Sequence, residues 1–223
     1  MLKIIIGNKA YSSWSLRGWL AVRQSGLPYE ELVAPMFMDD WPARKAQPDL
    51  AVSAGKVPTL WDGDVAVWDS IAILDYLDDI TGGIRFWPQD RAARALARSM
   101  AAEMHAGYVP LRKACPMNVR RIFDTQRPSP DVLVNLDRIS ALWEQARARF
   151  GGDEPYLFGA FGAADIMFAP VVFRIQGYQL PVSGVAQAYV EAMLAHPWMV
   201  EWVEGANAES WVLDQYEGGP DYS

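Results

Sequence analysis

The sequence is poor in cysteine and histidine, and this scarcity excludes several kinds of chemistry. Cys115 is the single cysteine among 223 residues, so an internal disulfide and a CxxC redox pair are both impossible. The two histidines, His105 and His196, lie far apart without neighbouring ligand spacing, and we predict no metal site. A lone thiol also fits a reducing compartment, which leads us to expect a cytoplasmic protein.

Other signals are missing as well. No apolar run approaches the ~20 residues that span a bilayer, and the short apolar start before Gly7 is typical of a buried strand, so we expect neither a membrane span nor a secretory signal. There is no GxGxxG, no Walker loop and no GxSxG motif. A formal net charge of −7 argues against a nucleic-acid partner.

What the chain does contain is apolar material for two packed domains: 51% of its residues are hydrophobic, and ten are tryptophans. In the first part, the spacing of apolar residues and turn residues predicts a β-α-β unit and then a β-hairpin and a helix. The expected strands are 2–7, 29–34, 57–61 and 65–68, and the expected helices are 14–25 and 70–81. Residues 36–55 are expected to be irregular, with a short turn or helix near Trp41.

The second part begins after a predicted linker at residues 81–90, which contains glycine and proline. Helical periodicity without a convincing strand predicts an all-α bundle there. The expected helices are 91–115, 129–151, 163–175 and 186–202, and the tail from Tyr216 is expected to be loose. The domains are therefore predicted at 1–81 and 91–223.

Three local motifs, in this order and spacing, carry a family resemblance. They are Tyr11-Ser12-Ser13-Trp14-Ser15-Leu16-Arg17, Gly55-Lys56-Val57-Pro58-Thr59-Leu60 and Asp69-Ser70-Ile71-Ala72-Ile73-Leu74-Asp75-Tyr76-Leu77. They resemble the serine loop, the KVPxL segment and the ESxAIxxYL segment of the cytosolic glutathione transferases. The zeta class, with its SSCSxR pattern, is nearest. The resemblance covers nearly the whole chain, and it implies a thioredoxin-like βαβ–ββα domain followed by an all-α helical bundle.

The resemblance implies a groove for glutathione in the first domain. A cis Val57-Pro58 bond would expose the backbone of Val57 for pairing with the tripeptide, although an X-Pro pair alone is ordinary. Ser70, at a helix N-terminus, would take the γ-glutamyl carboxylate, and Asp69 the ammonium group, or the pair is a plain helix cap. Asp69 is one methylene shorter than the Glu usual in the family. Lys45 and Lys56 are the candidates for the glycyl carboxylate.

The same resemblance implies that a hydroxyl in the first loop stabilises the glutathione thiolate. Ser12 is the first choice as catalytic residue and Ser13 the second, while Tyr11 is a rival donor. Capping the following helix is the alternative role for either serine. Trp14 stands where the zeta class has cysteine, and Trp19 replaces an arginine. Both departures count against the maleylacetoacetate isomerase activity of that class.

The second domain is expected to supply the electrophile pocket, together with Tyr11. His105, Tyr108 and Arg112 follow i, i+3, i+7 spacing on one predicted helix, although a solvated polar face explains the spacing equally well. If this face lines the cleft, Arg112 and Arg121 favour an anionic or carbonyl-bearing co-substrate. Arg17 is interpreted as a structural ion-pair partner, and Asp165 as part of a capping box with a role in folding.

The sequence therefore predicts a cytoplasmic, homodimeric glutathione transferase that uses glutathione as co-substrate. Two alternatives stay open. One is a glutathione-dependent isomerase of zeta type, and the other is a non-catalytic binding or regulatory protein with the transferase fold.

Overall fold

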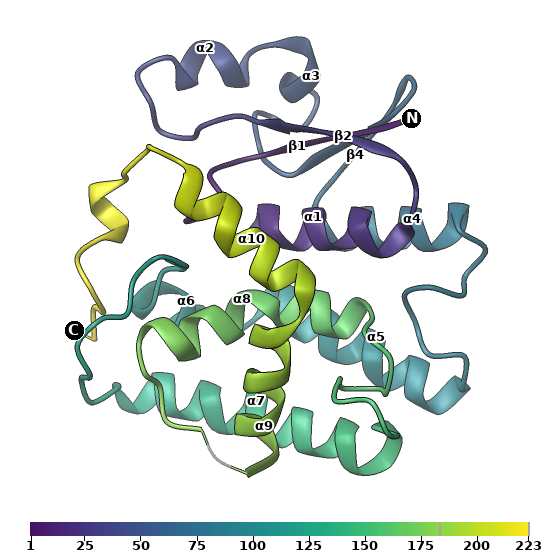
Figure 1. Cartoon of the computed structure of the whole chain (residues 1–223), viewed down its shortest axis with the longest axis vertical. Helices are drawn as coiled ribbons and strands as arrows, with labels where there is room; N and C mark the ends of the chain where they lie inside the picture. Colours follow the sequence, from purple (N-terminus) through teal and green to yellow (C-terminus); the bar gives the residue numbers. More distant parts are fainter. Residues whose placement is uncertain (183, 223) are drawn as a thin grey trace.

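The computed structural model describes residues 1–182 and 184–222, and its first part is built on a four-stranded mixed sheet. The strands are β1 (Leu2–Ile6), β2 (Tyr29–Val33), β3 (Thr59–Asp62) and β4 (Val65–Trp68), in the order β2-β1-β3-β4. β1 pairs parallel with β2 and antiparallel with β3, and β4 is antiparallel to β3. This confirms the predicted thioredoxin-like βαβ–ββα domain (Figure 1).

Two helices lie together on the face of this sheet that points toward the rest of the molecule. They are α1 (Ser13–Ser25) and α4 (Ser70–Ile80). α1 ends as predicted at Gly26, which caps it in the left-handed conformation with φ 69°. The segment predicted as irregular contains two short helices, α2 (Trp41–Lys45) and α3 (Pro48–Ala51), which Figure 1 shows on the other side of the sheet.

The second part is helical in the described residues, but two of the predicted helices are wrong in extent. The helices are α5 (Arg91–Ala106), α6 (Val109–Ala114), α7 (Pro130–Phe150), α8 (Ala163–Gly177), α9 (Gly184–Ala195) and α10 (Pro197–Ala208). The helix predicted over 91–115 breaks after Ala106, because Tyr108 has φ 60° and begins a new helix. The helix predicted over 186–202 breaks at His196, where Pro197 starts α10.

α8 is the central helix of the bundle, buried along almost its whole length. Asp165 secures its start, accepting hydrogen bonds from Gly162 N (2.9 Å), Leu157 N (3.1 Å) and the Tyr189 hydroxyl (3.0 Å). This confirms its predicted structural role. Burial outweighs these hydrogen bonds and raises the pKa of the Asp165 carboxyl to about 6.

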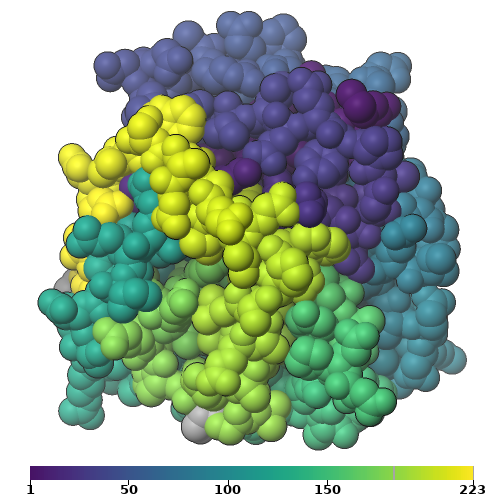
Figure 2. All heavy atoms as spheres, in the orientation of Figure 1, coloured from purple at the N-terminus to yellow at the C-terminus, as the bar shows by residue number. Residues whose placement is uncertain are grey.

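The C-terminal tail is packed and not loose, contrary to the prediction. It turns through a short 3-10 helix, η1 (Asp214–Tyr216), and runs back over both parts of the molecule, as the yellow surface in Figure 2 shows. Tyr216 stacks on Tyr11 with ring centroids 5.3 Å apart, and the Tyr222 hydroxyl lies 3.6 Å from Cys115 Sγ. Asp221 N donates to Ala114 O.

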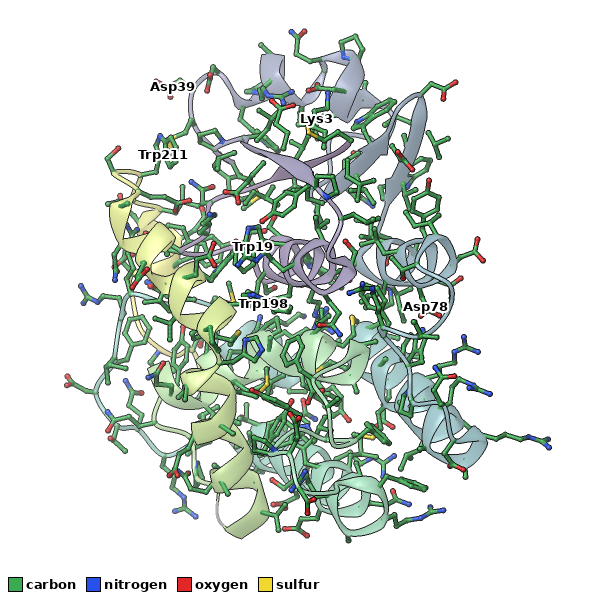
Figure 3. The ribbon with its side chains drawn as sticks, turned by 45° about the vertical axis from the view of Figure 1, so that its right-hand side comes forward. Lys3, Trp19, Asp39, Asp78, Trp198 and Trp211 are labelled. Atoms are coloured by element: carbon green, nitrogen blue, oxygen red, sulfur yellow. The ribbon has the colours of Figure 1, made fainter. Side chains whose placement is uncertain are left out.

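The two parts share one apolar junction along α1, α8 and α10. Trp19 and Trp198, labelled in Figure 3, lie where α1 meets α10, and Arg23 is within 6 Å of both rings. Trp202 packs against Trp19 at 5.4 Å and donates its indole N–H to Lys9 O. This hydrogen bond ties the loop before α1 to α10. Among the described helices, none is long and apolar enough to cross a membrane.

Candidate active site

A cleft of about 770 Å³ lies between the two parts, within the size range of ~300–1,000 Å³ of small-molecule sites. Its walls come from five places: the loop 11–14, the segment 36–41, the segment 55–58, the segment 68–70, and a helical wall that includes Arg112, Met117, Arg174 and Tyr216. The structure thus brings the three sequence motifs together around one cavity.

The segment at the start of β3 forms one edge of the cleft, and its Val57-Pro58 bond is cis, as predicted. Lys56 lies on this edge and is exposed, whereas Lys45 does not line the cleft but packs behind Gly55. Gly18 of α1 passes directly over Pro58: a Cβ there would be 2.6 Å from the proline ring. Only glycine lets this helix pass so close, and no motif in the sequence indicates this role for Gly18.

Asp69 and Ser70 begin α4 at another wall. Asp69 has φ 74° and caps the helix, because its Oδ1 accepts from Ile71 N at 2.9 Å. Ser70 is fully buried, and its Oγ has no hydrogen-bond partner in residues 1–182 and 184–222. A buried polar atom without a partner is costly, and here it sits at a helix N-terminus in the wall of a cleft.

The first loop carries a chain of hydroxyl contacts that the motif did not reveal. Ser12 caps α1: its Oγ accepts from Ser15 N (3.2 Å) and donates to Ser15 Oγ (2.8 Å). Ser15 Oγ in turn accepts from Gly7 N at 2.8 Å and is fully buried. Ser13 lines the cleft with a half-buried side chain that makes no hydrogen bond within the described chain. Ser12 therefore both caps α1 and lines the cleft.

The Tyr11 hydroxyl is fully engaged by the C-terminal part of the chain. It donates to Glu217 Oε1 (2.6 Å) and accepts from Arg120 (2.5 Å) and Leu213 N (3.3 Å). Burial, followed by the Glu217 carboxylate, raises the pKa of Tyr11. Its ring lines the cleft, but its hydroxyl holds the tail in place and has no proton to offer a ligand.

Trp14 lies at the foot of the helical wall, surrounded by cations. The guanidinium carbons of Arg17 and Arg112 are 4.9 and 5.1 Å from its ring centroid, and the His105 ring meets it edge-on at 5.4 Å. Arg17 was interpreted as an ion-pair partner, which is wrong for the described residues: no carboxylate lies within 4 Å of it, and its Nε donates to Met167 O at 2.9 Å.

The predicted face of the second domain is only partly present in the cleft. Arg112 lines the cleft; His105 stands behind Trp14, with Nε2 3.5 Å from Asp69 Oδ2. Tyr108 is buried away from the cleft and donates to Glu103 Oε1, because the helix break changes its direction. Arg121 is exposed beside Glu217 and does not line the cleft.

Some residues of the site carried no signal in the sequence. Arg174, near the end of α8, lines the cleft with a side chain that is 5% exposed. Glu209 fixes the first loop by accepting from Lys9 N (2.7 Å) and Ala10 N (3.2 Å). Both contacts join residues about two hundred positions apart, and only the fold brings them together.

Models of one protein family match both parts of the chain: "Glutathione S-transferase, N-terminal domain" over residues 11–80 and "Glutathione S-transferase, C-terminal domain" over 89–205. The Zea mays protein IN2-1 is 24% identical over 172 residues, which is 75% of this chain but only 63% of the length of IN2-1.

Two solved structures show the same fold over more than nine tenths of the chain. A glutathione transferase homologue from Burkholderia GL BGR1, with bound glutathione, has a TM-score of 0.68 and 21% identity, covering 93% of this chain and 99% of the other. A diazinon-metabolizing glutathione S-transferase of the silkworm Bombyx mori has a TM-score of 0.69 and 17% identity, covering 92% and 97%.

Proposed function

Because the chain belongs to the glutathione S-transferase family, we propose that it is a glutathione transferase that binds glutathione in the cleft along Val57-Pro58. One observation carries the proposal. Ser70, whose buried Oγ has no partner among the described residues, lines the cleft at the N-terminus of α4, and the cis-proline segment lines the same cleft. This arrangement suits a ligand with a carboxylate at one end and a peptide backbone in its middle.

Glutathione can satisfy the groups that line this part of the cleft. The γ-glutamyl carboxylate accepts a hydrogen bond from the Ser70 hydroxyl. The ammonium group of the same residue lies toward Asp69, whose Oδ1 still accepts from Ile71 N at the helix cap. The cysteinyl backbone pairs with Val57 in the manner of an added strand. The glycyl carboxylate lies toward Lys56, with Lys45 behind Gly55 as a more distant cation. The bound glutathione in the Burkholderia homologue supports this choice of ligand.

Ser12 is the proposed catalytic residue, with Ser15 behind it as a positioning residue. When the two hydroxyl protons rotate together, Ser15 Oγ donates to Ser12 Oγ and still accepts from Gly7 N. The proton of Ser12 is then free for the sulfur, while its oxygen accepts from two Ser15 groups. Such a chain of donors strengthens the last hydrogen bond, which stabilises the thiolate. Ser13, whose hydroxyl has no partner in the described chain, is the second candidate.

The reaction follows from this placement. The glutathione thiol loses its proton to solvent, and the thiolate attacks an electrophilic carbon held against the helical wall. Holding both reactants in one cleft and stabilising the sulfur anion are the two sources of rate acceleration.

Turnover with a chlorodinitrobenzene-type electrophile tests the roles of the serines. Ser12→Ala is expected to lower turnover about 10- to 100-fold, as the loss of a hydrogen bond to a charged group implies, and to change glutathione affinity much less. Ser25→Ala is a matched control: this buried serine lies in the same helix and its Oγ donates to Val22 O. Equal losses of turnover and affinity in Ser12→Ala would exclude the catalytic role. An active Ser12→Ala with an inactive Ser13→Ala would move it to Ser13.

The same assays separate the two alternative functions. An isomerase of zeta type consumes no glutathione, so a thiol titration during turnover distinguishes it from a transferase. A binding or regulatory protein with the transferase fold turns over no electrophile, and it is expected to be retained weakly or not at all on glutathione resin.

The assembly and location are part of the proposal. We place the protein in the cytoplasm as a homodimer, which is the assembly and location that the family resemblance implies. Light scattering across a dilution series tests the dimer, and a constant monomer mass would contradict it.

A further inference from the structure

Three guanidinium groups lie at or just behind the helical wall of the cleft, with little opposing charge. Arg112 and Arg174 line the cleft directly, and Arg17 lies beneath Trp14, within 5 Å of the same ring that Arg112 contacts. They come from α6, α8 and α1, so the fold gathers them from three distant segments.

None of the three has a carboxylate within 4 Å in the described part of the chain. Their partners are backbone carbonyls instead. Arg17 donates to Met167 O, Arg112 to the carbonyls at the end of α5, and Arg174 to Cys115 O (2.9 Å) and Pro170 O (3.2 Å).

The charges of the three groups oppose one another. Burial, followed by the positive charge of Arg112, lowers the pKa of Arg174 to about 10. Burial, then Arg112 and Arg174, lowers the pKa of Arg17, against a smaller opposing effect of Asp69. Cations gathered in this way are destabilising until an anion joins them.

We propose that the electrophile used by this enzyme carries a carboxylate, which Arg112 and Arg174 hold against the helical wall. The inference rests on the proposed transferase function and adds the substrate class. The two carboxylates of glutathione are directed to Ser70 and Lys56, on the walls of the first domain, which leaves the arginines for the second substrate. Met117 and Pro116 lie beside them in the cleft and offer apolar contact for its body.

A matched pair of electrophiles tests the proposal: 4-chloro-3,5-dinitrobenzoate, and the corresponding benzamide, which has the same shape without the charge. In both reactions the thiolate sulfur bonds to the carbon bearing chlorine, and chloride leaves with the electrons of the broken bond. The ratio of kcat/KM to the uncatalysed rate constant is measured for each. We expect the wild type to favour the benzoate at least tenfold, since a charged hydrogen-bonded pair is worth about that much.

The variant Arg112→Gln tests whether this arginine causes the preference for the benzoate. It is expected to lower kcat/KM for the benzoate about 10- to 100-fold and to leave the benzamide within about twofold, with Arg112→Lys intermediate. Arg149→Gln, an exposed charge removal in α7, is the control and should change neither. Arg174→Gln removes a buried side chain, so its result counts only where circular dichroism shows a native fold.

Binding measurements keep the proposal separate from the transferase function. Calorimetry with each compound, in the presence of unreactive S-methylglutathione and in its absence, reads the preference without turnover. Tighter binding of the benzoate, lost in Arg112→Gln, supports the inference even if no conjugate forms and the transferase function fails. Equal affinity or equal kcat/KM for the two compounds overturns it, as does an equal loss for both in Arg112→Gln.

Discussion

Replacing Ser15 by alanine tests whether the hydroxyl chain of the first loop prepares Ser12 for the thiolate. Ser15 lies outside the cleft lining and cannot touch the ligand, yet its Oγ is 2.8 Å from both Ser12 Oγ and Gly7 N. When Ser12 donates its proton to the sulfur, Ser15 Oγ donates to Ser12 Oγ, and the substitution removes this donor. A neutral hydrogen bond contributes about 1 kcal/mol net, so the thiolate should be destabilised by about that amount.

That free energy corresponds to an approximately fivefold smaller thiolate fraction below the pKa of the bound thiol. The assay follows the ultraviolet absorbance of thiolate as bound glutathione is titrated with base. Ser15→Ala should move the titration to higher pH, and Ser12→Ala should move it further, because a hydrogen bond to a charged sulfur is stronger. The double variant should resemble Ser12→Ala alone, since Ser15 acts through Ser12.

The variant also leaves Gly7 N buried without an acceptor, which should cost about 1–3 kcal/mol of folding free energy. Ser15→Thr keeps the hydroxyl and should restore the wild-type titration. Ser25→Ala removes a similar buried serine from the other end of α1 and should lower the melting temperature without moving the titration. An unchanged titration in a folded Ser15→Ala would refute the positioning role.

Three further predictions concern the scaffold of the cleft. Gly18→Ala should cost about 1–3 kcal/mol by forcing α1 away from Pro58, and it should weaken glutathione binding in a calorimetric titration; unchanged affinity would show that the proline edge does not need this contact. Tyr11→Phe removes the donor to Glu217, so the tail should be cleaved faster by protease while thiolate formation persists. Asp165 has a raised folded-state pKa of about 6, so the stability of the wild type relative to Asp165→Asn should fall as the pH rises from 3.8 to about 6. Denaturant unfolding of both proteins measures this difference, and a difference that rises over this pH range would contradict the prediction.

The fold was predictable from local patterns because most of its strands and helices have a recognisable signal in the sequence. Short apolar runs predicted the strands, the Asp62-Gly63-Asp64 turn predicted the hairpin, and Gly26 predicted the end of α1. The helix breaks were missed although their signals were present. Gly107 and Pro197 both stand at a break, but apolar periodicity continues across each one and predicts an unbroken helix.

The candidate site was predictable only where its groups belong to a motif. Asp69-Ser70 and Val57-Pro58 lie in the cleft because each begins a regular element at the same end of the sheet. Arg174 and Glu217 reach the site through long-range packing, and no local pattern encodes that. The role of Tyr11 in holding the tail was invisible for the same reason, since Glu217 is more than two hundred residues away.

Calorimetric titration of the protein with glutathione, compared between the wild type and Ser70→Ala, tests the central claim most directly. Ser70 Oγ has no partner to lose in the described structure, so the variant should melt at or above the wild-type temperature. The account predicts that the wild type binds one glutathione per chain and that Ser70→Ala binds it about 10- to 100-fold more weakly, because a hydrogen bond to a carboxylate is lost. Absence of binding to the wild type, or equal affinity in the two proteins, would contradict it.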